Sequence, residues 1–117
     1  MRHQVKSTRL NRPRHQLRAL MRSLVTSIIL YESIETTRNK AKMARAHVDR
    51  IIATAKRKDK LNAIRYVSGF LLDKNASLKV IDELIEKYKN RPSGFTRFTN
   101  TRIRKGDNAQ MVQFELV

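Results

Sequence analysis

The sequence contains no cysteine and only three glycines, and these shortages exclude several kinds of site. Without cysteine there can be neither a disulfide nor a zinc site with thiolate ligands. The three histidines (His3, His15 and His47) include no pair at helical spacing, so the sequence predicts no metal site. Three isolated glycines form neither a phosphate-binding loop nor a dinucleotide-binding motif. The ten acidic residues are scattered and offer no pair suited to acid/base catalysis. We therefore expect no enzyme, no cofactor and no small-molecule substrate.

Acidic residues are scarce, and long apolar runs are missing. The chain has 26 lysines and arginines against 10 aspartates and glutamates, so its formal net charge is +16. This charge exceeds what solubility requires, and nucleic-acid phosphates are the commonest partner that would neutralise it. The longest mostly apolar run, Leu24 to Leu30, is too short to cross a bilayer. We therefore expect a nucleic-acid partner and no membrane partner.

The shortage of acid is most extreme at the N-terminus. Residues 1–22 carry seven lysines and arginines and no aspartate or glutamate. A segment of this composition repels itself in water and buries little apolar surface. We predict that residues 1–12 form a basic extended arm that RNA orders, and that residues 13–117 form a single α+β RNA-binding domain. A mitochondrial transit peptide, which is also rich in arginine and poor in acid, is the alternative for the arm.

Apolar residues that recur every three or four positions predict a first helix directly after the arm. We place Pro13 at the first helical position, because its missing N–H costs nothing there. The predicted buried stripe of this helix is Leu17, Met21, Leu24 and Ile28.

Three further helices are predicted by the same spacing. The second runs from about residue 38 to 56, is capped by Thr37, and buries Ala41, Ala44, Val48, Ile51 or Ile52, and Ala55. The third covers residues 61–72 and buries Leu61, Ile64, Val67 and Leu71. The fourth is capped by Asn75 or Ser77 and buries Leu78, Ile81, Leu84, Ile85 and Tyr88. The other faces of this fourth helix are nearly balanced in charge, so we expect them to meet solvent or protein.

Three segments read as extended. Residues 31–37 are β-branched and alternating, which is typical of a strand. Residues 95–103 and 111–117 flank a turn-rich loop at Gly106, Asp107 and Asn108, and the last segment alternates with Val112, Phe114 and Leu116 on one side. The predicted fold class is therefore α+β, with several helices packed on a small, mostly antiparallel sheet that ends in a C-terminal β-hairpin.

Basic side chains gather in four places, and these are the candidate RNA-binding residues. The arm contributes Arg2, His3, Lys6, Arg9 and Arg12. The first helix repeats a cation every four residues, off its apolar stripe, at Arg14, Arg18 and Arg22. The second helix begins, against its own dipole, with Arg38, Lys40, Lys42 and Arg45. The predicted hairpin contributes Arg97, Arg102, Arg104 and Lys105. A solvated helix face is the alternative for both helical clusters.

Phe95 and Phe98 offer a second, weaker signal for RNA. Two aromatic residues on one strand are typical of the base-stacking strand of RNA-recognition motifs. The strand and helix order of that motif is missing here, so we expect both rings to belong to the core instead.

Several short motifs occur together and in order along the whole chain. They are Met1-Arg2-His3, Leu10-Asn11-Arg12, Ile34-Glu35-Thr36-Thr37, Lys40-Ala41-Lys42, Gly94-Phe95-Thr96-Arg97, and Arg104-Lys105-Gly106-Asp107-Asn108-Ala109. With these motifs the chain resembles the bacterial-type large-subunit ribosomal protein seventeen family. The resemblance implies a cytoplasmic structural constituent of the ribosome. It would bind large-subunit ribosomal RNA beside neighbouring large-subunit proteins near the tunnel exit. Because the likeness begins at Met1, we expect no cleaved presequence.

The chain departs from the family pattern in places. The link before the first helix is shorter and lacks the arginine of a usual His-Arg pair, Met43 stands where an acid is usual, and Gln110 replaces a common proline. Many relatives also continue past the last strand. These departures bear on local RNA contacts of the arm and tail.

Two other function classes fit the charge. A free architectural nucleic-acid binder would bind duplex DNA and RNA alike through phosphates. A protein attached to anionic membranes would need an amphipathic helix with an aromatic or leucine-rich face, whereas the apolar stripes here are needed for a core.

Overall fold

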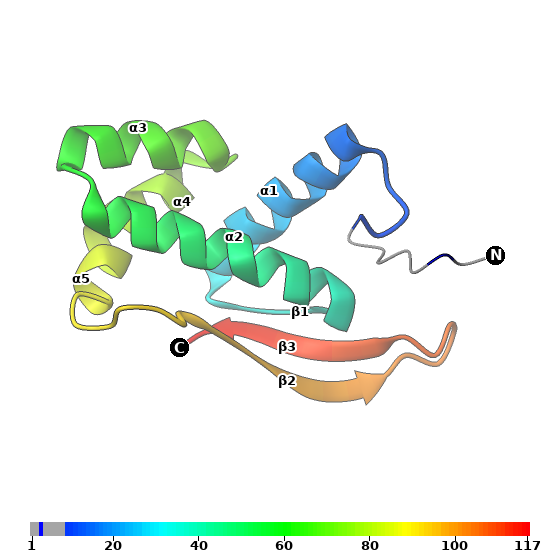
Figure 1. Ribbon diagram of the computed structural model, residues 1–117. Helices are drawn as coiled ribbons and strands as arrows, with labels where there is room; N and C mark the ends of the chain where they lie inside the picture. The colour runs from blue at the N-terminus through cyan, green and yellow to red at the C-terminus, as the bar shows by residue number, and fades with distance from the viewer. Residues whose placement is uncertain (1–2, 4–8) are drawn as a thin grey trace.

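The computed structural model describes His3 and residues 9–117. Arg2, Lys6 and most of the predicted arm lie outside these residues, so the ordering of the arm by RNA stays a prediction. The described part of the chain forms helices packed on one face of a small sheet (Figure 1). The predicted α+β class is therefore confirmed.

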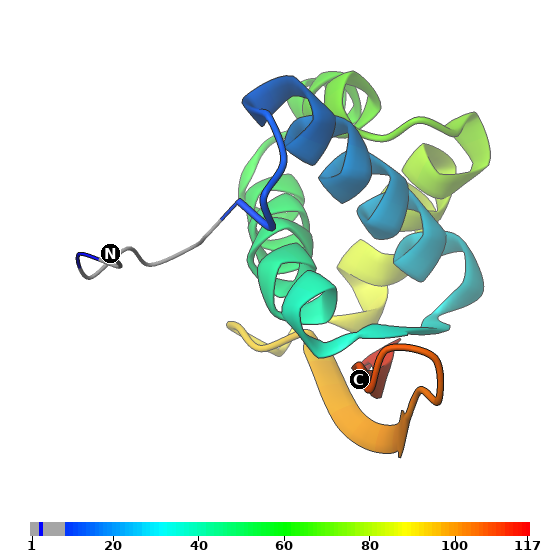
Figure 2. The same cartoon turned by 90° about the vertical axis from the view of Figure 1, so that its right-hand side faces the viewer.

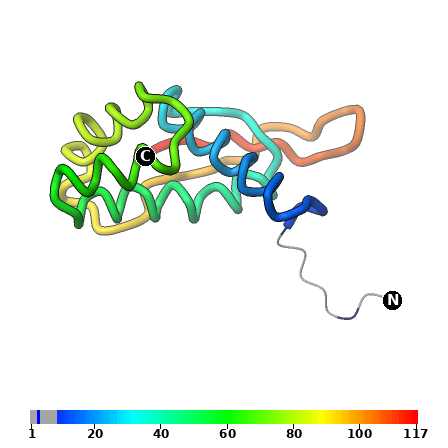
Figure 3. Tube along the Cα trace, turned by 90° about the horizontal axis from the view of Figure 1, so that it is seen from above, coloured from blue at the N-terminus to red at the C-terminus, as the bar shows by residue number. Residues whose placement is uncertain are grey.

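The described residues form a three-stranded antiparallel sheet in the order β1-β3-β2. Its strands are β1 (Ser33–Thr37), β2 (Thr96–Ile103) and β3 (Gln110–Leu116). The last strand lies in the middle, where Phe114 is opposite Ile34 on one side and Phe98 on the other. The predicted C-terminal hairpin of β2 and β3 is thus confirmed, and its turn projects beyond the helices in Figure 3.

The helices follow the sequence prediction closely in position. They are α1 (Arg14–Tyr31), α2 (Arg38–Arg57), α3 (Lys60–Phe70), α4 (Lys74–Lys79), a π-helical turn η1 (Val80–Leu84) and α5 (Ile85–Lys87). Helix α2 contacts all three strands, and α1 lies beside it above the sheet (Figure 2). Because α4, η1 and α5 follow one another without a break, they correspond to the single fourth helix that the sequence predicted.

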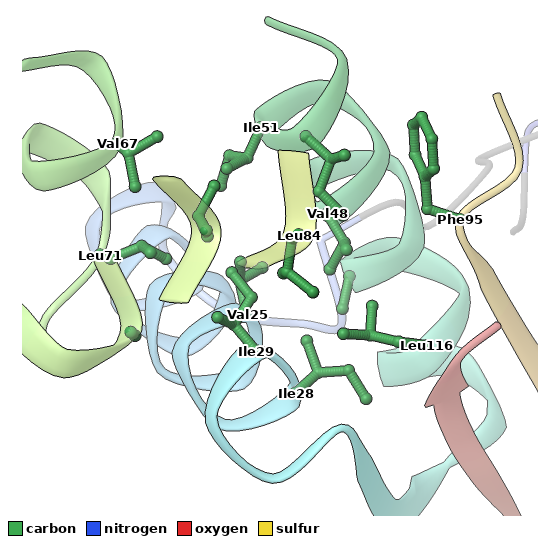
Figure 4. Close-up of a cluster of buried hydrophobic side chains, with 14 of the residues drawn as sticks. Val25, Ile28, Ile29, Val48, Ile51, Val67, Leu71, Leu84, Phe95 and Leu116 are labelled. Carbon is green, nitrogen blue, oxygen red and sulfur yellow. The ribbon is translucent and has the colours of Figure 1, made fainter. Parts of the chain in front are cut away.

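The core lies between the helices and the inner face of the sheet. Figure 4 shows side chains from α1, α2, α3, η1 and β3 meeting there. Phe95 and Phe114 are fully buried, and Phe98 is half-buried against the same cluster. Phe95 and Phe98 therefore both pack in the core, as expected. The predicted stripe of α2 is also confirmed, since Ala41, Ala44, Val48, Ile51, Ile52 and Ala55 are all buried.

The buried face of α1 differs from the prediction. The buried apolar residues of α1 are Met21, Val25, Ile28 and Ile29, whereas Leu17 and Leu24 are only half-buried. Between Leu24 and Leu30 the apolar residues fall on more than one side of the helix, so periodicity does not select a single face there. Its neighbours α2 and α4 decide which arc is covered.

Three predicted core leucines and isoleucines are in fact exposed. Leu61 and Ile64 of α3 and Leu78 of α4 are exposed by 57%, 40% and 49%. The predicted burial of Val67 and Leu71 is confirmed, and Ala63, which was not predicted, is buried with them on the side of α3 that faces α2. A short helix at the edge of the domain buries only one narrow stripe. In α3 the smaller residues Ala63 and Val67 form that stripe, and the prediction that Leu61 and Ile64 are buried was wrong.

Two helix starts also differ in detail. Pro13 occupies the N-cap position of α1, so the helix begins one residue later than predicted, and the Pro13 carbonyl accepts from Leu17 N. Helix α4 is capped by Asp73, whose Oδ1 accepts from Asn75 N at 2.7 Å, and not by Asn75 or Ser77. An ionised carboxylate is a strong N-cap acceptor and is favoured by the helix dipole.

Candidate nucleic-acid interface

Positive charge is unevenly compensated in the described part of the chain. All ten acidic residues lie there, and none is in α1. The ion pairs among the described residues involve Lys79, Lys87, Arg97, Arg102 and Arg104. No arginine or lysine of α1 or α2 takes part in any of these pairs. The two long helices therefore present charge that the protein itself leaves uncompensated.

The hairpin arginines are arranged differently. Arg97 donates from Nε and Nη2 to Glu115 Oε1 at 2.9 and 2.7 Å, across the β2–β3 pair. Arg102 Nε donates to Glu35 Oε1 at 3.0 Å, which ties β2 to a residue of β1. These pairs lie on the sheet surface, where exposed ion pairs stabilise little. They do orient the guanidinium groups and reduce their net field.

The β2–β3 turn is held by a third pair. Arg104 Nε and Nη2 donate to the two carboxylate oxygens of Asp107 at 3.0 and 2.6 Å. The hydrogen bonds from Arg104 lower the pKa of Asp107 to about 2. Asn108 follows with a positive φ of 59°, a conformation that asparagine tolerates. Lys105 in this turn is exposed and forms no ion pair within the described residues.

The three arginines of α1 are not equivalent. Arg14 and Arg18 are exposed, whereas Arg22 is half-buried and donates from Nε to the main-chain oxygen of Phe70 at 2.7 Å. Arg22 therefore joins α1 to the end of α3. The sequence prediction grouped Arg14, Arg18 and Arg22 as equivalent, because a spacing of four residues does not reveal a tertiary partner.

The start of α2 forms a second basic surface. Arg38 Nη1 donates to Gln110 Oε1 at 3.2 Å, and a hollow of about 400 Å³ lies between this helix start and the start of β3. Lys42 lines the same hollow, and Lys40 is half-buried nearby in the chain. Arg45 is exposed, with its guanidinium carbon 5.9 Å from the centre of the Phe98 ring. Thr37 occupies the N-cap position but forms no side-chain hydrogen bond to the helix.

Comparison with known proteins identifies the chain. Residues 20–117 match the family described as Ribosomal protein L17. The chain is 41% identical to large ribosomal subunit protein bL17 of Campylobacter concisus (strain 13826), over all of this chain and 98% of the relative. It is 40% identical to the protein of the same name from Helicobacter hepaticus (strain ATCC 51449 / 3B1), over the full length of both. A third, from Desulforudis audaxviator (strain MP104C), is 43% identical over 86% of this chain and 88% of its own length.

The chain belongs to the ribosomal protein L17 family.

The resemblance seen in the sequence motifs is thereby confirmed. The L17 family consists of structural components of the large ribosomal subunit and is not a family of enzymes. Among residues 3 and 9–117, no three histidine or acidic side chains are arranged to hold a metal ion. No helix in the described residues is long and apolar enough to cross a membrane.

For this member of the L17 family, the remaining predicted RNA-binding residues are placed as follows. His3, Arg9 and Arg12 are exposed, and Arg9 and Arg12 are joined by a main-chain hydrogen bond of 2.9 Å. Arg14 and Arg18 share one hollow with Arg50 of α2, which the sequence prediction missed. Arg50 lies three residues after His47 on the same side of α2. That spacing was the only sequence signal for Arg50. The spacing indicates a site only when α1 is known to pack against α2.

Proposed function

We propose that this protein is a structural constituent of the large subunit of the cytoplasmic bacterial ribosome. In this proposal it binds large-subunit ribosomal RNA mainly through phosphates and supports subunit assembly and translation. Membership of the L17 family supports the assignment to the large subunit. The observation that carries the binding mode is the separation of charge, because α1 and α2 hold basic side chains that no described acidic residue pairs with.

Phosphate contact is the physically favoured mode for such a surface. A-form RNA has a deep, narrow major groove that side chains do not read, so proteins bind it by shape, phosphates and 2′-hydroxyls. Each phosphate that a lysine or arginine neutralises releases counterions and strengthens binding at low salt. The exposed arginines of α1 and the basic start of α2 supply these contacts, together with the arm and Lys105. The paired arginines of the hairpin contribute less.

The division of the chain follows from the same proposal. Residues 1–12 act as a basic arm on RNA, and residues 13–117 act as the folded body that positions it. Leu10 is half-buried and packs against the core, so the end of the arm is anchored to that body. The motifs shared with the family further suggest a position near the tunnel exit, beside other large-subunit proteins. The nearly charge-balanced outer surface of α4, η1 and α5 suits a protein neighbour or solvent.

Sedimentation and binding together test the proposal. A tagged copy of the full chain in a bacterial lysate should travel with the large subunit on a sucrose gradient and stay bound in moderate salt. Purified protein should bind a fragment of large-subunit RNA more tightly than unrelated duplex DNA at the same salt. Sedimentation at the top of the gradient would contradict the ribosomal assignment. Equal binding of duplex DNA would favour a free architectural protein instead.

A further inference from the structure

Three helices of the domain enclose a hollow of about 400 Å³ that the charge pattern alone does not explain. Residues of α1, α2 and α3 line it. Its floor is apolar, since Met21 and Ile51 are each exposed by only 2%. A volume of this size lies at the lower end of the range that small ligands occupy in proteins. The hollow is therefore large enough for a single flat group and too small for a helix.

The wall of the hollow is aromatic. His47 of α2 and Phe70 of α3 stack with ring centres 5.8 Å apart and planes 21° apart. Tyr66 lies one turn before Phe70 on α3 and is also half-buried at the hollow. Burial and the neighbouring Arg50 lower the pKa of His47, which favours the uncharged ring. An uncharged, partly exposed aromatic wall offers a stacking surface.

The rim of the hollow is cationic. Arg14 and Arg18 approach from α1 and Arg50 from α2, and all three are exposed. No acidic residue lines the hollow, and none of the three arginines takes part in an ion pair among the described residues. Three uncompensated guanidinium groups around an apolar, aromatic floor fit a ligand that is anionic at one end and flat at the other.

We infer that this hollow receives one unpaired nucleotide of large-subunit ribosomal RNA, with its base against the aromatic wall and its phosphate among the three arginines. The inference rests on the proposed function and adds a defined site to it. Unpaired nucleotides can be splayed out of the RNA helix and stacked on aromatic side chains or guanidinium planes. A base paired within a helix does not reach such a hollow. A protein segment would have to be both acidic and aromatic to match the same lining, so RNA is the occupant to which the chemistry points.

Stacking and phosphate contact can be separated by substitution. Tyr66→Leu keeps an apolar side chain but removes the ring, whereas Tyr66→Phe keeps the ring. Base-aromatic stacking predicts that Tyr66→Leu weakens binding of the RNA fragment about tenfold, with an unchanged salt slope, and that Tyr66→Phe binds like the parent. Arg50→Gln should lower the salt slope by roughly 0.7–0.9 units. Arg65→Gln is the matched control, because Arg65 is exposed on α3 and does not line the hollow.

A crosslinking experiment identifies the occupant directly. Full-length protein is bound to a large-subunit RNA fragment carrying 4-thiouridine, irradiated and mapped by peptide mass. We expect crosslinks between an unpaired nucleotide and the peptide that holds Tyr66 and Phe70. The same mapping on intact subunits should give RNA at this peptide; a protein crosslink there in place of RNA would overturn the inference.

The proposed function and the nucleotide site would be contradicted by different results. If the parent protein binds neither the subunit nor the fragment, the proposed function fails. If the parent binds but Tyr66→Leu and Arg50→Gln both bind like Arg65→Gln, the function stands and the nucleotide site is wrong. Thermal melts of each variant ensure that a loss of binding is not a loss of folding.

Discussion

The Nε of Arg22 donates to the main-chain oxygen of Phe70 at 2.7 Å, and this bond joins the first helix to the end of the third. One turn further along α1, Thr26 Oγ1 donates to the oxygen of Arg22 at 2.7 Å and accepts from Leu72 N at 3.2 Å. The chain that leaves α3 is thus bound to α1 at two points. Arg22 therefore belongs to the tertiary fold as well as to the basic surface.

Replacing Arg22 should cost stability. Arg22→Ala removes a charged donor, so the Phe70 carbonyl loses this hydrogen bond. We therefore expect the free energy of unfolding to fall by about 1–3 kcal/mol. Arg18→Ala is the control, because Arg18 is exposed on the same helix, and it should change stability by about 0.5 kcal/mol or less. Urea denaturation of both variants measures the difference. Equal midpoints would mean that the Arg22 bond does not stabilise the domain.

The buried face of α1 can be checked in the same way. Ile29 is fully buried, so Ile29→Ala should lower the free energy of unfolding by about 2–5 kcal/mol. Leu24→Ala should cost clearly less, because Leu24 is only half-buried. Thermal melts at one pH compare the two. A larger loss for Leu24→Ala would restore the stripe that the sequence predicted.

Uncompensated and paired arginines should differ in their effect on RNA binding. Neutralising Arg14 and Arg18 together should lower the salt slope of binding by roughly 1.4–1.8 units, at about 0.7–0.9 units for each phosphate contact. Neutralising Arg97 and Arg104 removes the same charge but should change the slope by less than about one unit, since Glu115 and Asp107 already occupy these guanidinium groups. Titration of a large-subunit RNA fragment from low to moderate salt gives both slopes. Identical slopes for the two double variants would refute the distinction.

His47 predicts a pH dependence of stability. Its pKa lies below the ordinary value of 6.5 because of burial first and the charge of Arg50 second. As the pH falls below about 6.5, the unfolded chain takes up this proton before the folded protein does, so stability decreases. Arg14 and Arg18 line the same hollow as His47, and no acidic residue does. Urea midpoints between neutral and mildly acidic pH should therefore fall in the parent protein and fall less in His47→Gln; a parallel decline in both would assign the effect to other groups.

Removal of the arm tests the division of the chain. Deleting residues 1–12 should leave a folded domain that binds RNA more weakly, because the fully buried apolar residues that the structure describes all lie further along the chain. Deleting residues 1–9 is the control, since it keeps Leu10 and its contact with the core. Circular dichroism and RNA titration follow folding and binding separately. A chain that no longer folds without residues 1–12 would show that the arm is part of the domain.

Local patterns in the sequence determined the secondary structure and the fold class. The small, evenly spaced residues from Ala41 to Ala55 predicted both α2 and its buried face, because a helix with one apolar stripe can bury only that stripe. The alternation of Val112, Phe114 and Leu116 predicted a strand with one buried side. The uneven distribution of charge, and the motifs of the L17 family, were likewise visible without coordinates.

Tertiary structure alone decided the features that depend on contacts between distant segments. The buried face of α1 was set by its neighbours, because the apolar residues between Leu24 and Leu30 do not share one side of the helix. Arg22 and Phe70 are 48 residues apart, and Arg102 and Glu35 are 67 apart, so no local spacing could pair them. The hollow bounded by Arg18, Arg50 and Tyr66 is lined by residues of three different helices. Periodicity acts within a helix or strand, whereas these partners were selected by the packing of one element against another.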